Sequence, residues 1–249
     1  MYERIAVLAD VHCVLPALEA VLAEPDVRSA DLVVLAGDVA VGPQPLQTLD
    51  LLDTLGDRVV WVRGNCERIT VELARSGTPG STMAAWGAAL LRPEQVARMA
   101  ALPPSVTLAV RGLGEVLVCH ATPRDDEEIV LVDSPLSRWA EVLSGVPDDV
   151  RTVVLGHTHM PYLRLADRRT IVNPGSVGMP YGTSGAHWAL LGGPTGAAVQ
   201  LRRTEFDAHA AATGSDFPRV AEFVDACLLH NRSDAEALAE YAARPTRPR

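Results

Sequence analysis

The stretch Leu32 to Gly42 constrains the fold most, because its short apolar, largely β-branched run stops at Gly37-Asp38. A run of this kind, bounded by a turn former, predicts a strand buried on both faces. In open α/β sheets, sites lie beyond the carboxyl ends of such strands. An aspartate after a strand is also a common helix cap or turn former. The interpretation of Asp38 therefore depends on the residues at the ends of the other strands.

The same arrangement recurs along the chain. The predicted strand Ile5 to Ala9 is followed by Asp10 and His12, and two residues at i and i+2 of an extended segment point the same way. Further predicted strands are followed by an asparagine, by one histidine and by a pair of histidines. The polar residues collected at strand ends are Asp10, His12, Asp38, Asn65, His120, His157 and His159.

Helical spacing of apolar residues alternates with these strands in the first half of the chain, which predicts βα units. From Tyr162 onward strands predominate, and the last 45 or so residues are alanine-rich and helical. The remaining predicted strands are Arg58–Arg63, Ser105–Val110, Glu115–Cys119, Arg151–Leu155, Tyr162–Leu165, Thr170–Val172, His187–Leu191 and Ala198–Arg202. We predict one domain over 1–249, with a catalytic core at about 1–203 and C-terminal helices at about 204–249 packed on it.

Composition excludes several classes of function. The formal charge is −9, and no basic run offers a track for a phosphate backbone, so we expect no binding to duplex nucleic acid. No apolar run approaches the roughly 18 residues needed to span a bilayer, and the N-terminus has no signal-peptide pattern. The four cysteines show no paired spacing, which favours reduced thiols. We expect a soluble, cytoplasmic protein without membrane contact.

The collected side chains are carboxylates, an amide and imidazoles without a thiolate, a donor set that suits manganese, iron, zinc, cobalt or nickel. Seven donors exceed what one ion needs. Two divalent ions about 3.5–4 Å apart that share a carboxylate would use them all. Asp38 is our candidate for the shared carboxylate, and manganese is our first choice of metal.

These motifs, Asp-x-His, Gly-Asp, Gly-Asn, His and Gly-His-x-His in order from Asp10 to His159, resemble those of the calcineurin-like metallophosphoesterase superfamily, and among its members the bacterial and archaeal YfcE-type phosphodiesterases. The resemblance implies an α/β fold, a four-layer α-β-β-α sandwich of two mixed sheets flanked by helices. It implies that Asp38 bridges two ions, and that Asp38, Asn65 and His120 serve catalysis by a bridging hydroxide. The implied ligands are Asp10, His12, Asp38 and His159 on one ion, and Asp38, Asn65, His120 and His157 on the other.

One position departs from the family pattern. Many relatives have a histidine after the motif asparagine, taken to protonate the leaving oxygen, whereas this chain has Cys66. Cysteine is a poor proton donor to an alkoxide, so we predict a preference for aryl esters or phosphate anhydrides over alkyl monoesters. The alternative is that Cys66 is a buried small residue that caps a helix.

The substrate contacts predicted here are Asn65, Cys66 and Arg124. Arg124 follows His120 by four residues and could grip phosphate with two hydrogen bonds. The alternative is a surface ion pair of Arg124 with Asp125 or Asp126. The acidic run Asp125 to Glu128 predicts a solvated helix start.

We therefore expect a binuclear metal-dependent phosphoesterase that hydrolyses small, nucleotide-type phosphodiesters or phosphoanhydrides. One alternative is a non-catalytic scaffold, because a retromer subunit of this fold resembles a phosphoesterase with a decayed metal shell. Another is a broad phosphomonoesterase. The oligomeric state stays open, with a homodimer as one option.

Overall fold

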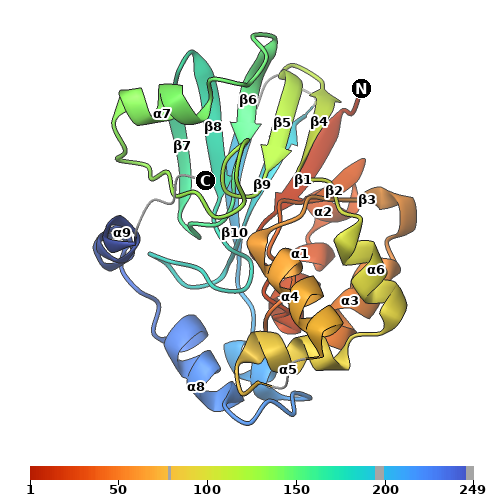
Figure 1. Ribbon diagram of the computed structural model, residues 1–249. Helices are drawn as coiled ribbons and strands as arrows, with labels where there is room; N and C mark the ends of the chain where they lie inside the picture. The colour runs from red at the N-terminus through yellow and green to blue at the C-terminus, as the bar shows by residue number, and fades with distance from the viewer. Residues whose placement is uncertain (78–79, 194–198, 245–249) are drawn as a thin grey trace.

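Two five-stranded sheets form the centre of the protein in the computed structural model, which describes residues 1–77, 80–193 and 199–244. The first sheet has the order β10-β9-β1-β2-β3 and the second the order β4-β5-β6-β8-β7 (Figure 1). Strands of the first sheet are β1 (Arg4–Leu8), β2 (Leu32–Leu35), β3 (Val59–Trp61), β9 (Ala186–Gly192) and β10 (Val199–Thr204). Strands of the second are β4 (Ser105–Val110), β5 (Gly114–Cys119), β6 (Val150–Val154), β7 (Pro161–Ala166) and β8 (Arg169–Pro174).

Alternation along β1 explains why the sheets stack. Ile5 and Val7 point into the core between the two sheets, whereas Ala6 and Leu8 point into the core beneath the helices. All four side chains are buried, because neighbouring residues of a strand face opposite sides and both sides of this sheet are covered. A strand this apolar is stable only inside a layered structure.

Helices cover the outer face of each sheet. Those on the first sheet are α1 (Leu15–Ala23), α2 (Pro25–Arg28), α3 (Pro45–Asp53), η1 (Gly56–Arg58), α4 (Asn65–Ser76), α5 (Met83–Leu90) and α6 (Pro93–Ala100). On the second sheet α7 (Leu136–Val142) packs the fully buried Trp139 against strand residues such as Val153. The predicted four-layer sandwich of two mixed sheets is confirmed.

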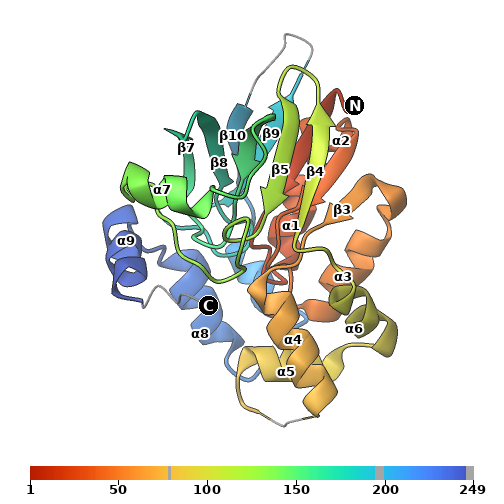
Figure 2. The same cartoon turned by 45° about the horizontal axis from the view of Figure 1, so that its top comes forward.

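The carboxyl ends of parallel strands define one edge of the sandwich. β1, β2 and β3 run parallel in one sheet, and β5, β6 and β8 run parallel in the other. Figure 2 shows the loops beyond these strands converging below the two sheets. β3 is shorter than the predicted strand Arg58–Arg63, because the N–H of Arg63 already donates to Pro103 O at 2.8 Å. Ala198, the predicted start of the last strand, lies outside the described residues.

The C-terminal segment forms four short elements, η2 (Ala208–Ala212), α8 (Val220–Val224), η3 (Asp225–Leu229) and α9 (Asp234–Ala243). Val224 and Leu228 join the core beneath the first sheet. By contrast, Tyr241 of α9 packs with Leu131 and Met160. Residues 245–249 lie outside the described part of the chain. Within the described ranges, no helix has the length and apolarity needed to cross a membrane.

Replacement of a fully buried leucine tests the core on the helix side of the first sheet. Leu18→Ala in α1 should lower the free energy of unfolding by about 2–5 kcal/mol, since it removes buried methyl groups and leaves a cavity. Leu165→Ala in β7 is the matched control, because Leu165 is 73% exposed, and it should change the free energy by less than about 0.5 kcal/mol. Urea unfolding followed by circular dichroism measures both; equal losses would contradict the described packing.

Candidate metal centre

Five of the seven predicted ligands have a left-handed backbone, with φ between 46° and 67°. A residue with a Cβ adopts this conformation at a cost of about 1–2 kcal/mol, and such strain is concentrated at functional sites. The sharp turns occur where the chain leaves β1, β2 and β6, and they direct polar side chains toward one another. The five residues are Asp10, His12, Asp38, His157 and His159.

The first group of donors contains Asp10, His12 and His159, whose ligand atoms all lie within 4.8 Å of one another. The two Nε2 atoms of His12 and His159 are 3.3 Å apart, and His159 Nε2 is 3.4 Å from Asp10 Oδ1. All three side chains are buried. One carboxylate and two imidazoles that face a common point form a suitable partial shell for a divalent transition metal.

The second group contains Asp38, His120 and His157. His120 Nε2 lies 3.2 Å from Asp38 Oδ1 and 3.1 Å from the amide oxygen of Asn65. Asp38 also lies within 4.8 Å of a His12 nitrogen, so it is within reach of both groups. The structure thus brings all seven predicted ligands to one edge of the sandwich, in the two sets that the resemblance implies. Their role as ligands stays a prediction.

Backbone carbonyls orient three of the imidazoles. Nδ1 donates to a carbonyl oxygen in His12 (Val41 O, 3.2 Å), His120 (Ala36 O, 2.9 Å) and His159 (Met179 O, 2.8 Å). A carbonyl only accepts, so Nδ1 carries the proton and Nε2 faces the centre. A hydrogen bond from the ring nitrogen that does not face the metal is the usual support of a metal-binding histidine.

Burial and neighbouring charges strongly shift the pKa values of the side chains at the centre. Burial and the neighbouring His120 lower the pKa of His157 to about 4, which keeps that imidazole neutral and able to bind a metal. Burial alone also lowers the pKa of His120, but the charge of Asp38 outweighs it and raises that pKa to about 10. In return, although burial opposes it, His120 holds the pKa of Asp38 well below its usual range. A metal ion therefore competes with a proton at His120.

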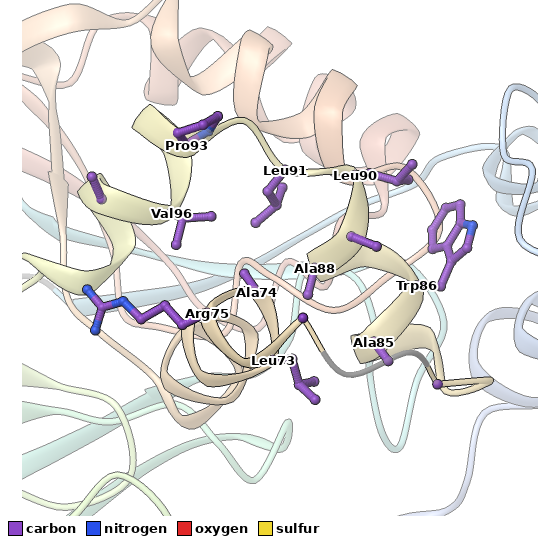
Figure 3. Close-up of a pocket in the computed structure, with 14 residues that line it drawn as sticks. Leu73, Ala74, Arg75, Ala85, Trp86, Ala88, Leu90, Leu91, Pro93 and Val96 are labelled. Atoms are coloured by element: carbon purple, nitrogen blue, oxygen red, sulfur yellow. The ribbon is translucent and has the colours of Figure 1, made fainter.

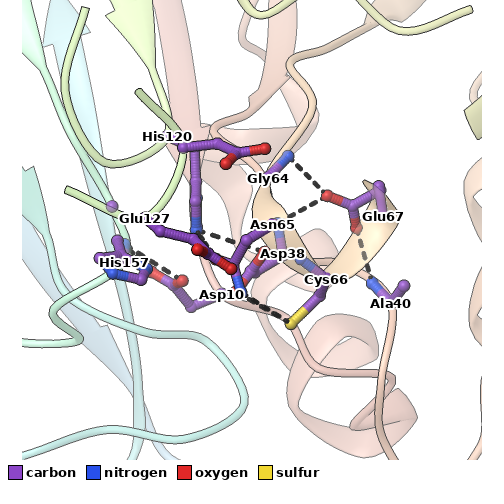
Figure 4. Close-up of polar contacts among 12 residues, drawn as sticks. Asp10, Asp38, Ala40, Gly64, Asn65, Cys66, Glu67, His120, Glu127 and His157 are labelled. Atoms are coloured by element: carbon purple, nitrogen blue, oxygen red, sulfur yellow. Dashed lines mark hydrogen bonds and ion pairs between the residues drawn. The ribbon is translucent and has the colours of Figure 1, made fainter. Parts of the chain in front are cut away.

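Glu67, at the start of α4, fixes the loop that carries Asp38. Its buried carboxylate accepts hydrogen bonds from the N–H groups of Asp38 (2.9 Å), Ala40 (2.8 Å) and Gly64 (2.7 Å), as Figure 4 shows. Sequence reasoning missed this role. The available signal was the spacing Gly-x-x-Glu, in which the glutamate reaches back to the N-cap residue just before its helix.

Gly37 and Gly64 are required by close approach. A Cβ on Gly64 would fall within contact distance of the Asp38 carboxylate and 2.5 Å from the Asp38 backbone nitrogen. A Cβ on Gly37 would collide with the ring of His120. The glycine of each motif therefore gives the room in which the next polar group reaches the centre.

Cys66 is attached to Asp38 through two groups. Its backbone N–H donates to Asp38 Oδ1 at 2.8 Å, and its thiol donates to Asp38 Oδ2 at 3.1 Å. Burial and the charge of Asp38 raise the pKa of the thiol well above its ordinary value. Cys66 therefore stays protonated and holds the central carboxylate from the first turn of α4.

The acidic loop differs from expectation. The run Asp125 to Glu128 does not begin a helix: Asp125 forms an isolated bridge with Thr122, Asp126 and Glu127 form a bend, and arginines pair with the carboxylates. Arg68 of α4 binds Asp126 (2.9 Å) and Glu127 (2.9 Å). Arg124 pairs with Glu128 (2.6 Å) and with Glu141 of α7 (2.8 Å), instead of with Asp125 or Asp126. Its proposed contact with substrate stays a prediction.

Loops that follow the second sheet support the ligands from behind. Ser176 donates to the carbonyl of Asp10 at 2.7 Å, and Asn173 donates to Gly156 O at 2.9 Å. From α9, the Tyr241 hydroxyl donates to the carbonyl of His157 at 2.9 Å. Sequence reasoning did not anticipate the contact of Tyr241, for which the local sequence carries no signal.

Two cavities lie near these elements. One of about 780 Å³ between α4, α5 and α6 is mostly apolar, and none of its lining residues is a predicted ligand (Figure 3). Another, of about 240 Å³, adjoins the centre because His120 lines it together with Arg63, Arg68 and Arg124. The lining of the second cavity is charged, because it also includes Asp125 and Asp126.

A sandwich with clustered donors at the carboxyl ends of its parallel strands defines a metallophosphoesterase-type fold. Residues 4–192 match the model of the calcineurin-like phosphoesterase superfamily domain, and the chain belongs to this superfamily. The family predicted from the motifs is confirmed.

Relatives of the chain are distant. The uncharacterized protein MJ0912 of Methanocaldococcus jannaschii is 25% identical over 201 residues, which cover 72% of this chain and 77% of that protein. A hypothetical protein from Pyrococcus horikoshii has a similar structure, with TM-score 0.73, 19% identity and coverage of 89% of this chain and 95% of that one. A metallophosphoesterase from Sphaerobacter thermophilus gives TM-score 0.69, 24% identity and coverage of 96% and 99%. The structural likenesses concern the fold.

Glu67→Gln tests the support of Asp38. A glutamine amide would place N–H groups against backbone donors, so we expect the affinity for Mn²⁺ to fall by about 10- to 100-fold and the melting temperature to drop. Glu72→Gln is the control, because this carboxylate lies on the same helix, is 65% exposed and makes only a long ion pair with Arg68. Calorimetric titration of metal-free protein measures the affinities; equal affinities in the two variants would contradict the role of Glu67.

Tyr241→Phe tests the contribution of α9. The ring keeps its packing, but the carbonyl of His157 loses its donor, so we expect a loss of about 1 kcal/mol in the free energy of unfolding and weaker binding of one metal equivalent. Tyr2→Phe, remote from the centre, is the control. The measurements are thermal unfolding and metal titration, and an unchanged titration would show that Tyr241 serves packing alone.

Proposed function

We propose that the protein is a hydrolase of phosphodiesters or phosphoanhydrides that depends on two divalent metal ions. The observation that carries this proposal is the position of Asp38, which lies within reach of both donor groups. The donor set suits manganese first, with iron, nickel, cobalt or zinc as alternatives. Membership of the calcineurin-like phosphoesterase superfamily supports hydrolase activity.

Different residues would serve different parts of the proposed reaction. When bound, the metal pair supplies a hydroxide nucleophile near neutral pH and neutralises charge on the phosphoryl oxygens. Asp38 would hold the two ions together, and the first group of Asp10, His12 and His159 would fix one of them. Asn65 has its amide oxygen at His120 and donates one amide N–H to Cys66 Sγ at 3.9 Å, which leaves its second amide N–H for a phosphoryl oxygen. The positions of these side chains are fixed before substrate arrives, which lowers the reorganisation needed in the reaction.

The protonation of the leaving group limits the choice of substrate. Hydrolysis forms a new P–O bond from water and breaks the P–O bond to the leaving group, which departs with the electron pair. Cys66 stands where many relatives have a histidine, and its thiol is bonded to Asp38 with a raised pKa. It is therefore a poor acid for an alkoxide. Aryl esters and anhydrides need no such acid, because their leaving groups are stable as anions.

We also propose that the substrate is a small phosphorylated molecule and that the protein acts in the cytoplasm. The charge of −9 supports a small substrate because it disfavours binding of long nucleic acids. The modest volume of the charged cavity beside His120 also supports a small substrate.

The first test compares bis-p-nitrophenyl phosphate with p-nitrophenyl phosphate. Metal-stripped protein supplied with Mn²⁺, Ni²⁺, Co²⁺, Zn²⁺ or Mg²⁺ should recover hydrolysis of the diester in preference to the monoester. Asp38→Ala should lose both binuclear metal binding and turnover, with Asp57→Ala on the exposed turn before β3 as the control.

Three outcomes would contradict parts of this proposal. If Asp38→Ala kept two metal equivalents and full activity, the bridging role would be wrong. Preferred turnover of alkyl monoesters would favour a phosphomonoesterase. A folded protein that binds two ions but hydrolyses neither compound would favour the scaffold.

A further inference from the structure

The charged cavity beside the metal centre contains three arginines with different surroundings. It has a volume of about 240 Å³, and its lining combines three arginines with two carboxylates: Arg63, Arg68, Arg124, Asp125 and Asp126, together with His120, Thr122, Pro104 and Pro123. His120 also belongs to the second donor group, so the cavity adjoins the metal centre.

Two of the three arginines are already neutralised. Arg68 is held between Asp126 and Glu127, and its contact with Asp126 uses two guanidinium nitrogens at 2.9 and 3.1 Å. Arg124 is held by Glu128 and Glu141. A ligand anion would have to compete with these carboxylates for either side chain.

Arg63 is in a different state. Within residues 1–77, 80–193 and 199–244, its side chain has no ion pair and no hydrogen bond, and its Nε is buried without a partner. It is half-buried at the end of the β3 segment, two residues before Asn65. Asp125 also lines the cavity, but its Oδ1 already accepts from the N–H of Glu127 at 2.8 Å. An unpaired cation in a partly closed site is a strong attractor for an anion.

We propose that Arg63 binds a second phosphate group of the substrate, next to the one at the metal centre, so that the preferred substrates are phosphoanhydrides. This inference rests on the proposed function and narrows it. A simple diester places an uncharged group in the cavity and leaves Arg63 unpaired. An anhydride places a phosphate there, whose charge pairs with the guanidinium. Because Cys66 is a poor acid, a leaving phosphate that departs as an anion is stabilised by the same contact.

The binding test uses methylenediphosphonate, which cannot be hydrolysed, and methylphosphonate, which lacks the second phosphonate group. Calorimetry at constant excess Mn²⁺ should show that the wild type prefers the diphosphonate. Arg63→Gln should weaken diphosphonate binding by about 10- to 100-fold and leave methylphosphonate binding within about threefold. Arg63→Lys, which keeps the charge, should retain part of the preference for the diphosphonate. This variant distinguishes loss of the charge from a general effect of the substitution on folding. Arg111→Gln, whose side chain is exposed on the β4–β5 turn, is the control.

The results separate this inference from the proposed function. If Arg63→Gln and the wild type prefer the diphosphonate equally, the inference is overturned. It is also overturned if a further variant, Arg124→Gln, loses this preference while Arg63→Gln keeps it. If Arg63 controls the preference but no phosphate compound is hydrolysed, the subsite stands and the proposed activity fails. If the aryl diester is hydrolysed while the wild type shows no preference for the diphosphonate, the activity stands and the subsite fails.

Discussion

The buried carboxylate of Asp38 is the group on which the whole centre depends. Removing a charge from water costs several kcal/mol unless hydrogen bonds and opposite charges replace the lost solvation. At Asp38 this replacement comes from the N–H and thiol of Cys66 and from His120, and its backbone N–H is bound by Glu67. These partners come from α4 and from the end of β5, so one carboxylate connects both sheets.

The same contacts explain why position 66 affects chemistry and structure together. A thiol is small enough to remain beneath Asp38 and weakly acidic enough to stay protonated beside it. The first property preserves the geometry of the donors, and the second removes an acid from the reaction. Under the proposed function, selectivity for good leaving groups would follow from the way in which the carboxylate is held. Arg63, three residues earlier, would then supply the unpaired positive charge for a leaving phosphate.

Much of the fold and the seven predicted ligands could be derived from the sequence because parallel strands carry their carboxyl ends to a common edge. The seven predicted ligands follow five strands within a few residues, so local patterns were sufficient to locate them. Tyr241 and His157 are 84 residues apart, and only tertiary packing brings them together. The prediction of a helix start at the acidic run was wrong. Arginines bind its carboxylates, and the local sequence does not show these pairs.

The left-handed backbone at five of the donors would influence which substitutions a chain of this kind accumulates in evolution. Each of these positions costs about 1–2 kcal/mol for a side chain other than glycine. Glycine there would relieve the strain and remove the donor in one step. A descendant relieved of selection for its chemistry would therefore gain stability as it lost its ligands, and the fold would outlast the activity.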